Sequence, residues 1–227
     1  MVHKEETAII GKLINMNKNK KGKFIVLDGG EGAGKTTVAK AVVEKLGWNA
    51  IYTREPGGSR YSEQIRELLL SDDAKHSDAE TQFALFWAAR RDFLKHVVIP
   101  ALKDGKTVVT DRFDSSTYAY QIVAQGNTSL LKLFWQVREA FLGEYEPDMY
   151  ILLDIEPVDG LARAVGRGEE TLNHFDKRKI EFHIQVNSGL RDFILKKMDN
   201  GEVVDASQPL EKVIEDTMVL INEVADK

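Results

Sequence analysis

Residues 24–37 read FIVLDGGEGAGKTT, an apolar segment followed by a glycine-rich loop that ends in Lys and Thr. The spacing Gly29-x-x-x-x-Gly34-Lys35-Thr36 is that of a phosphate-binding loop, which stands between a strand and a helix. The glycines allow backbone amides to surround phosphate oxygens at the positive N-terminus of the following helix. The sequence therefore predicts a nucleoside triphosphate site at the end of a β-strand.

This triphosphate site is expected to use the whole loop and the first residues of the helix. Lys35 is expected to face solvent and contact the outer phosphates, while the Thr36 hydroxyl binds magnesium. The residues predicted to bind the triphosphate here are Gly29, Gly30, Glu31, Gly32, Ala33, Gly34, Lys35, Thr36 and Thr37.

The composition excludes several other classes of protein. A chain of 227 residues with 43% hydrophobic and 30% charged residues fits one globular domain with a full core. A net charge of -5 without a basic stripe argues against nucleic-acid binding, and we see no apolar segment that calls for a membrane. The absence of cysteine excludes disulfides and thiolate zinc sites, and is compatible with a reducing cytoplasm.

Apolar segments and amphipathic segments alternate along the chain. We expect further strands at 50–53, 107–110, 150–153 and 203–204, and helices at 61–70 and 81–102. This order predicts an α/β fold, a parallel sheet with helices on both faces and ligands at the carboxyl ends of its strands. Residues 1–22 are expected to form an extension, a short helix and a polar linker, before a single domain over 23–227.

Two polar clusters follow predicted strands. The first is Thr53-Arg54-Glu55-Pro56-Gly57-Gly58, and the second is DRFDSSTYAYQ at 111–121. Asp111 is expected to orient magnesium through water, or else to form a structural salt bridge. Arg112 has the fork of donors that binds phosphate at two points.

Together with the phosphate loop, LFWAARR at 85–91, YEPDMYILLDIEP at 145–157, EFHIQV at 181–186 and VDASQPLEKV at 204–213, these clusters resemble the thymidylate kinase family. The resemblance runs from about Lys23 to the C-terminus. It implies a P-loop nucleoside monophosphate kinase fold, with a five-stranded parallel sheet and a small lid near 163–180. It also implies ATP-dependent phosphorylation of dTMP to dTDP with Mg²⁺, as a step of dTTP synthesis, by a cytoplasmic homodimer.

The resemblance also implies which side chains bind dTMP. It places Phe86 under the thymine ring and Arg90 at its carbonyl edge, and it makes Tyr120 the residue that crowds the sugar 2′ position. Glu31 would lie near the 3′-hydroxyl, and Glu55 near the acceptor phosphate and its water or magnesium. The full set implied is Glu31, Glu55, Arg66, Phe86, Arg90, Arg112, Ser116, Thr117, Tyr120 and Gln121.

The lid is where the chain departs from its family. Gly32 stands where one group of the family has an arginine, so the chain resembles the group that takes its arginines from the lid. The lid offers Arg163 and Arg167, at the i,i+4 spacing that shares a helix face. We expect Arg167 to act in catalysis with Lys35 and Arg112, and Arg163 either to share that role or to cover adenine beside Ser207.

The same segment has Asn173-His174 in place of a usual Asp-Arg pair, and Lys177-Arg178-Lys179 in place of an acidic run. These departures leave the identity of the catalytic arginine open. Two other functions stay open as well: a deoxynucleoside kinase that uses Glu55 as a base on a 5′-hydroxyl, and a non-catalytic nucleotide-binding module. For the homodimer, we expect helices away from the lid to meet, with Phe83 and Trp87 among the contacts.

Overall fold

The computed structural model of the protein describes residues 22–166, 168 and 173–225. All of the predicted N-terminal extension except Gly22 lies outside these residues, and so do Arg167 and the lid residues 169–172. None of the described helices is both long and apolar enough to span a membrane.

A five-stranded parallel sheet forms the centre of the molecule, with the strand order β2-β3-β1-β4-β5. The strands are β1 Phe24–Gly29, β2 Ala50–Arg54, β3 Thr107–Asp111, β4 Met149–Asp154 and β5 Gly201–Asp205. In the register Asp111 of β3 lies between Leu27 of β1 and Arg54 of β2. The predicted α/β fold with a five-stranded parallel sheet is therefore confirmed, and the polar strand ends meet at one edge.

Helices cover both faces of this sheet because its strands are apolar on both sides. Phe24 and Val26 of β1 belong to one buried cluster, and Ile25 and Leu27 belong to the opposite one. This alternation follows from the two-residue repeat of a strand.

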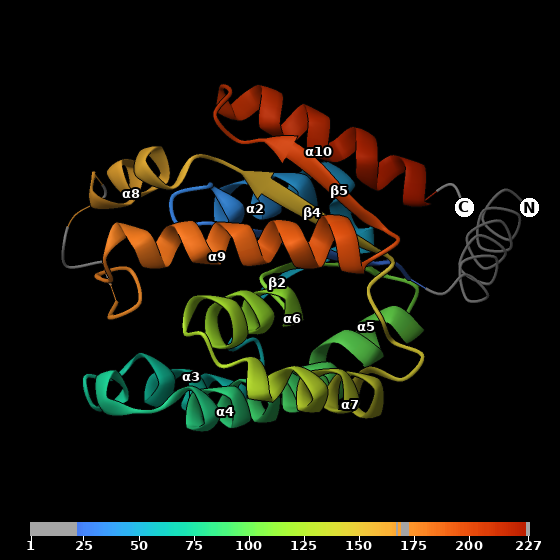
Figure 1. The fold of residues 1–227 in the computed structure, drawn as a ribbon. Helices are drawn as coiled ribbons and strands as arrows, with labels where there is room; N and C mark the ends of the chain where they lie inside the picture. The colour runs from blue at the N-terminus through green and yellow to red at the C-terminus, as the bar shows by residue number, and fades with distance from the viewer. Residues whose placement is uncertain (1–21, 167, 169–172, 226–227) are drawn as a thin grey trace, which may run out of the picture.

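In Figure 1, α10 lies above the sheet, while α9 and the layer of α3, α4 and α7 lie below it. The α-helices are α2 Lys35–Leu46, α3 Arg60–Leu70, α4 Ala79–Phe93, α5 Ile99–Lys103, α6 Asp114–Thr117, α7 Leu131–Leu142, α8 Pro157–Val165, α9 Ile180–Asp192 and α10 Leu210–Ala225. Shorter turns are 3-10 helices at Gly47–Asn49, Asp73–His76 and Thr128–Leu130, and π-helices at Leu94–Val98, Tyr118–Ala124 and Phe193–Lys197.

The helix predicted over 81–102 is divided in the structure. Its first part is α4, and a π-helical turn at Leu94–Val98 joins it to α5. Phe83 and Trp87, which we expected at a dimer interface, are 4% and 2% exposed and belong to the core. That expectation is wrong because α4 packs against neighbours on both sides, with the Trp87 ring 5.5 Å from Phe134 of α7.

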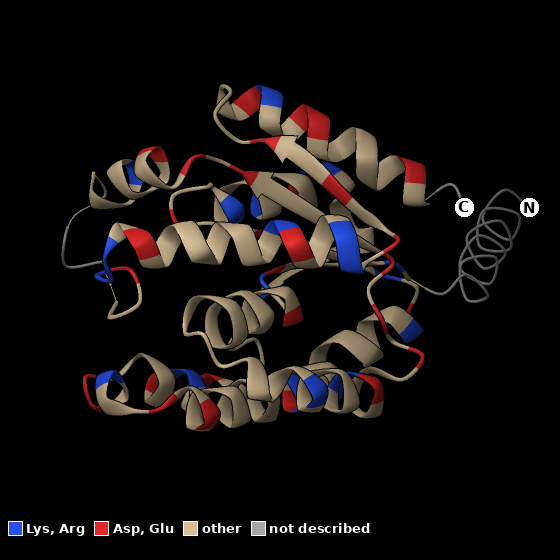
Figure 2. Ribbon diagram, viewed as in Figure 1, with Lys and Arg blue, Asp and Glu red and all other residues tan. Residues whose placement is uncertain are grey.

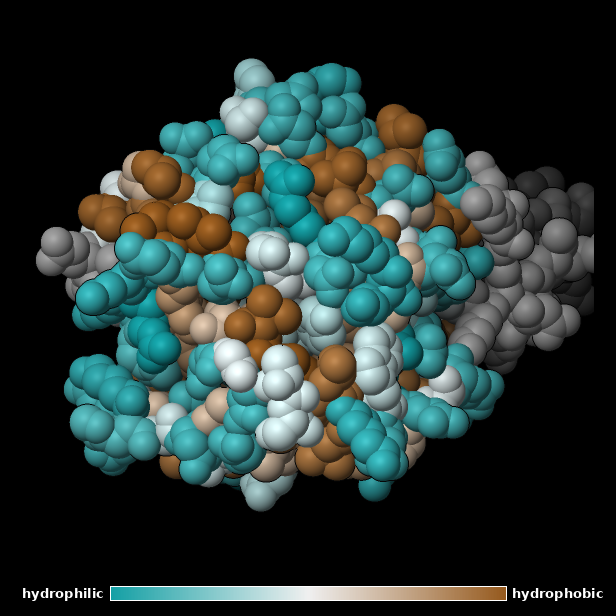
Figure 3. Space-filling view, in the orientation of Figure 1, coloured by the Kyte–Doolittle hydropathy of each residue, from teal (hydrophilic) through white to brown (hydrophobic). Residues whose placement is uncertain are grey.

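The surface is mixed in charge and mostly polar. Figure 2 shows acidic and basic residues interspersed along α9 and α10. Figure 3 shows a group of apolar side chains over α8, where Val158 and Val165 are exposed. Helix α8 leads directly into the predicted lid.

Candidate functional site

The phosphate loop connects β1 to α2 and has the backbone that its glycines permit. Gly32 and Gly34 have φ angles of 70° and 85°, a region that side chains with a Cβ rarely adopt. Helix α2 begins at Lys35, so its free N–H groups point into the loop. This arrangement provides the cradle of donors that phosphate oxygens require.

Lys35 differs from our expectation of a solvent-facing side chain. It is buried at 7% exposure, and its Nζ donates to the carbonyl oxygen of Gly30 at 2.7 Å. Burial, and next the nearby positive charge of Arg112, lower the pKa of Lys35. A phosphate oxygen in place of the neutral Gly30 carbonyl would therefore stabilise the Lys35 ammonium, because it carries negative charge.

The phosphate loop also touches the start of α8. A Cβ placed on Gly32 would lie 1.9 Å from the carbonyl oxygen of Gly160, and one placed on Gly160 would lie 2.1 Å from that of Glu31. Two glycines thus allow the loop and α8 to meet backbone against backbone.

Arg112 lies between the phosphate loop and the second polar cluster. It is the one described non-glycine residue with a positive φ, 71°. Its guanidinium donates to Glu31 Oε1 at 2.7 Å and to the Ser116 hydroxyl at 3.2 Å. Asp28, which is fully buried, lies 3.4 Å from the same guanidinium and accepts hydrogen bonds from both Ser115 and Ser116. The strained backbone and these partners aim Arg112 at the loop.

Thr36 and Asp111 provide oxygen atoms at the place where the metal is expected. The Thr36 hydroxyl donates a short hydrogen bond to the Asp111 carboxylate at the end of β3. Among the described residues there is no cluster of three or more His, Cys, Asp or Glu side chains suited to a metal. One hydroxyl and one carboxylate fit Mg²⁺, which takes few protein ligands and completes its shell with water and substrate phosphates.

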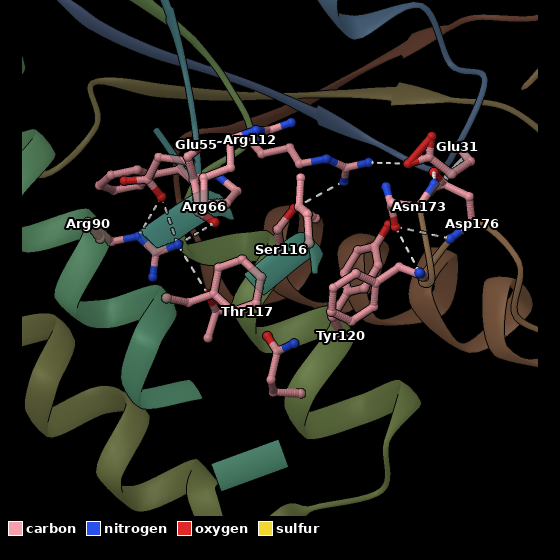
Figure 4. A pocket seen from close by; sticks show the side chains of 16 residues that line it. Glu31, Glu55, Arg66, Arg90, Arg112, Ser116, Thr117, Tyr120, Asn173 and Asp176 are labelled. Carbon is pink, nitrogen blue, oxygen red and sulfur yellow. Dashed lines mark hydrogen bonds and ion pairs between the residues drawn. The ribbon is translucent and has the colours of Figure 1, made fainter. Parts of the chain in front are cut away.

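A separate pocket opens beside the loop, and every residue predicted to bind dTMP lines it (Figure 4). The lining residues are Glu31, Glu55, Pro56, Arg66, Leu70, Phe86, Arg90, Arg112, Phe113, Ser116, Thr117, Tyr120, Gln121, Asn173, Phe175 and Asp176. We call this the acceptor pocket. Its walls come from segments that are far apart in the sequence, and no local pattern other than the motifs indicates that they meet.

Arg90 and Glu55 form a buried ion pair at one end of the acceptor pocket. In Figure 4 Arg90 reaches both Glu55 and Thr117; its Nε lies 2.8 Å from Glu55 Oε2, and its Nη2 lies 3.1 Å from the Thr117 hydroxyl. Burial raises the pKa of Glu55 to about 8, although Arg90 opposes the shift. Arg90 Nη1, Glu55 Oε1 and Gln121 Oε1 are buried without hydrogen-bond partners among the described residues. Such atoms are rare in folded proteins, and these three belong to residues that line the acceptor pocket.

Arg66 lies where the acceptor pocket meets the phosphate loop. It lines both the acceptor pocket and the adjoining cavity that contains Lys35, Thr36 and Asp111. Its Nη1 donates to the carbonyl oxygen of Pro56 at 2.8 Å, and burial lowers its pKa. Lys40, Tyr52 and Arg54 line the same cavity and were not predicted from the sequence.

Residues 173–176 of the predicted lid close one side of the acceptor pocket, and three of them were missed by sequence reasoning as site residues. Phe175 packs against Tyr120, with ring centroids 5.7 Å apart, and Asp176 and Asn173 line the opening. Burial, and next the charge of Glu31, raise the pKa of Asp176 to about 6. The one sequence signal for this turn was the Asn173-x-x-Asp176 spacing. The side chain of each of these two residues accepts a hydrogen bond from the backbone N–H of the other.

On the other side of the loop, Arg163 lies beside Ser207; both residues are expected to contact adenine, and that role stays a prediction. Arg163 donates to the carbonyl oxygens of Ala206 and Ser207 at 2.8 and 3.2 Å. Both residues line a shallow depression with Ala33, Gly34 and Val38. Helix α8 ends at Val165, and Arg167 lies outside the described residues, so its role stays a prediction.

Comparison with known proteins identifies the family of this chain. The family model for thymidylate kinase matches residues 27–217. The thymidylate kinase of Clostridium novyi is 40% identical over 199 residues, which cover 86% of this chain and 96% of that protein. Those of Limosilactobacillus reuteri and Bacillus velezensis are 39% and 38% identical, over 89% and 91% of this chain and 96% and 98% of their own. With its motifs, its sheet and its two joined pockets, the chain belongs to the thymidylate kinase family.

Proposed function

We infer that this protein transfers the γ-phosphoryl group of ATP to dTMP and forms dTDP. The observation that carries this proposal is the set of unpartnered atoms in the acceptor pocket. Arg90 Nη1 can only donate a hydrogen bond, and Gln121 Oε1 can only accept one. The edge of thymine offers the matching pair, an O4 acceptor and an N3–H donor.

The acceptor requires little chemical activation. A nucleoside monophosphate is already largely a dianion at neutral pH, since its second pKa is about 6. The protein must bring two negatively charged phosphates into line, and Arg66, Arg112 and Lys35 surround the place where the pockets join. Charge that develops on the transferred group would be stabilised by these cations, which are held in place beforehand.

Thr36 and Asp111 would hold Mg²⁺, which supplies charge neutralisation at the outer phosphates when it is bound. Lys35 would leave Gly30 for the phosphate oxygens, and Arg112, aimed by Asp28 and Ser116, would hold the acceptor phosphate. Tyr120, packed under Phe175, would crowd the sugar 2′ position and favour deoxyribose. Glu31, which accepts a hydrogen bond from Arg112, would lie near the sugar 3′-hydroxyl.

One observation favours a second candidate, a deoxynucleoside kinase. A carboxyl whose pKa is about 8 suits a general base at neutral pH, and Glu55 has that property. A 5′-hydroxyl acceptor would need such a base. The arginines favour the phosphate acceptor instead, because a hydroxyl does not require Arg66 and Arg112 around it.

The decisive experiment supplies the protein with ATP, Mg²⁺ and one acceptor at a time, and measures ADP. We expect dTMP to be used far better than thymidine, dCMP or dGMP. A faster rate with thymidine would favour the deoxynucleoside kinase, and no ADP with any acceptor would favour a binding module. As a control, Lys35→Ala should lose most activity while it keeps the wild-type circular dichroism spectrum.

We also propose a homodimer in the cytoplasm, where ATP and free nucleotides are held. The outer side of α3 and α4 supports a dimer: Tyr61 and Leu68 are 62% and 60% exposed, and Ala84 and Ala88 are small and exposed. Each large apolar side chain buried there would contribute about 1.5–3 kcal/mol. Light scattering at micromolar concentration tests this, and a monomer would contradict it; Leu68→Glu should dissociate the dimer.

A further inference from the structure

Gln82 of α4 is buried, 5% exposed, and is not among the residues that line the acceptor pocket. Its amide nevertheless contacts Gln121, which does line the pocket. Gln82 Oε1 accepts a hydrogen bond from Gln121 Nε2 at 3.4 Å and from Gln125 Nε2 at 2.8 Å, and its own Nε2 donates to the carbonyl oxygen of Ser77 at 3.2 Å. The three groups form a chain that ends at the base-binding end of the pocket.

The direction of this chain is set at Ser77. A backbone carbonyl can only accept, so the Gln82 amide must turn its NH₂ group toward Ser77 and its oxygen toward Gln121. Gln121 must then turn its NH₂ group toward that oxygen, because two oxygens face to face would repel each other. The Gln121 oxygen then faces away from Gln82. It is fully buried and has no hydrogen-bond partner among the described residues.

We propose that Gln82 is a positioning residue that sets the base specificity of the enzyme by fixing the amide orientation of Gln121. This inference rests on the proposed function. With its orientation fixed, Gln121 presents an acceptor to the pyrimidine N3 position. Thymine and uracil carry a proton on N3 and can donate to it, whereas cytosine has a bare N3 that is itself an acceptor.

Without Gln82, the Gln121 amide is free to rotate. The rotated form would present NH₂ to the pocket and pair with cytosine N3, so rejection of dCMP would weaken. Arg90 is held separately by Glu55 and Thr117 and still donates to the base edge. Some preference for dTMP should therefore remain after the chain is broken.

The test uses Gln82→Met, which keeps the length of the side chain and removes its hydrogen bonds. The measured quantity is the ratio of kcat/KM for dTMP to kcat/KM for dCMP. We expect it to fall by about tenfold or more, the size of one buried hydrogen bond, through a lower value for dTMP and a higher one for dCMP. The dTMP to dUMP ratio should not change, because these two bases have the same N3–H edge.

Gln125→Met is the matched control. It removes the other donor to the same oxygen but keeps the Gln82–Gln121 contact, so the dTMP to dCMP ratio should stay at the wild-type value. In a Gln121→Leu background, Gln82→Met should have no further effect on the ratio, because the two residues act as one unit. An unchanged ratio in Gln82→Met, or an equal loss for all three substrates, would overturn the proposal.

Failure of the proposed function gives a different result, since the wild-type protein would then not prefer dTMP at all. If Gln82→Met does not fold, NMR of the wild-type dTMP complex decides the question. The Gln121 Nε2 protons should show stronger contacts to the Gln82 side chain than to the base. The reverse order of intensities would contradict the proposed orientation.

Discussion

The acceptor pocket and the opposite side of the phosphate loop, around Arg163, are built in different ways. In the acceptor pocket, charged side chains hold one another before any ligand arrives: Arg90 is fixed by Glu55 and Thr117, and Arg112 by Glu31 and Ser116. On the opposite side, Arg163 of α8 donates to backbone carbonyl oxygens, and the same helix exposes Val158 and Val165.

The difference follows from what each side must recognise. A nucleobase edge is distinguished by the direction of its hydrogen bonds, so the groups that read it must be held rigidly. A triphosphate is bound largely by backbone amides and charge, which tolerate looser side chains. Substitutions in the acceptor pocket, including the lid residues 173–176 that close it, should therefore change stability as well as activity. Substitutions of Arg163 and Arg167 should change activity alone.

The largest effect is expected from Arg167→Ala. Gly32 leaves the phosphate loop without an arginine, so we propose that Arg167 of the lid supplies a further cation to the transferred group, beside Lys35 and Arg112. We expect kcat to fall by roughly 10³-fold or more, with a much smaller change in ATP binding and an unchanged melting temperature. Steady-state kinetics and calorimetry measure both quantities.

Two lid substitutions serve as controls for that comparison. Arg163→Ala should raise the KM for ATP more than it lowers kcat, because Arg163 contacts the loop at Ala206 and Ser207. His174→Ala should change kcat by less than about threefold, since its Nε2 faces the carbonyl oxygen of Leu69 at 3.0 Å. If kcat fell as much in either variant as in Arg167→Ala, the assignment of Arg167 as the catalytic arginine would be wrong.

The second prediction tests the acceptor pocket. Arg90→Met should lower the free energy of unfolding by about 3 kcal/mol as well as abolish dTMP use, because it leaves Glu55 buried without its partner. The loss should be near the low end for such pairs, since Glu55 can take up a proton. Urea unfolding measures it, and Arg90→Met with Glu55→Gln should recover part of the stability but none of the activity.

The third and smallest effect concerns pH. Because the pKa of Asp176 is raised from 3.8 to about 6, the folded protein binds this proton more tightly than the unfolded chain does. The contribution of Asp176 to stability is therefore present below pH 4 and is lost as the pH rises toward 6 and above. Between pH 4 and pH 7, the free energy of unfolding of Asp176→Asn should rise by about 1–3 kcal/mol relative to that of the wild type. A constant difference in urea unfolding across this range would contradict the burial argument.

Much of the fold was predictable because its signals are local. The phosphate loop fixes a strand before it and a helix after it, and the apolar strands at 107–110 and 150–153 indicated a sheet covered on both faces. The motifs named Arg90, Thr117 and Gln121, and the structure brings them into one pocket. Their roles toward dTMP stay predictions.

What the sequence did not reveal depends on contacts between distant elements. No pattern around Gln82 indicates that it meets Gln121, 39 positions away. The apolar residues of α4 indicate burial, but they do not tell whether a core or a second subunit covers them, and Phe83 and Trp87 were misjudged for that reason. Lys35 was placed in solvent because the collapse of its side chain onto Gly30 depends on the detailed shape of the loop.

The contact between Gly32 and Gly160 bears on how this enzyme group can evolve. One nucleotide change in a glycine codon can give an arginine codon, so a single change could be expected to place an arginine in the phosphate loop at position 32. It is not enough, because a Cβ at Gly32 would lie 1.9 Å from the carbonyl oxygen of Gly160, and the backbone φ of 70° is one that residues with a Cβ rarely adopt. The start of α8 must first move away from the loop before position 32 can carry a side chain.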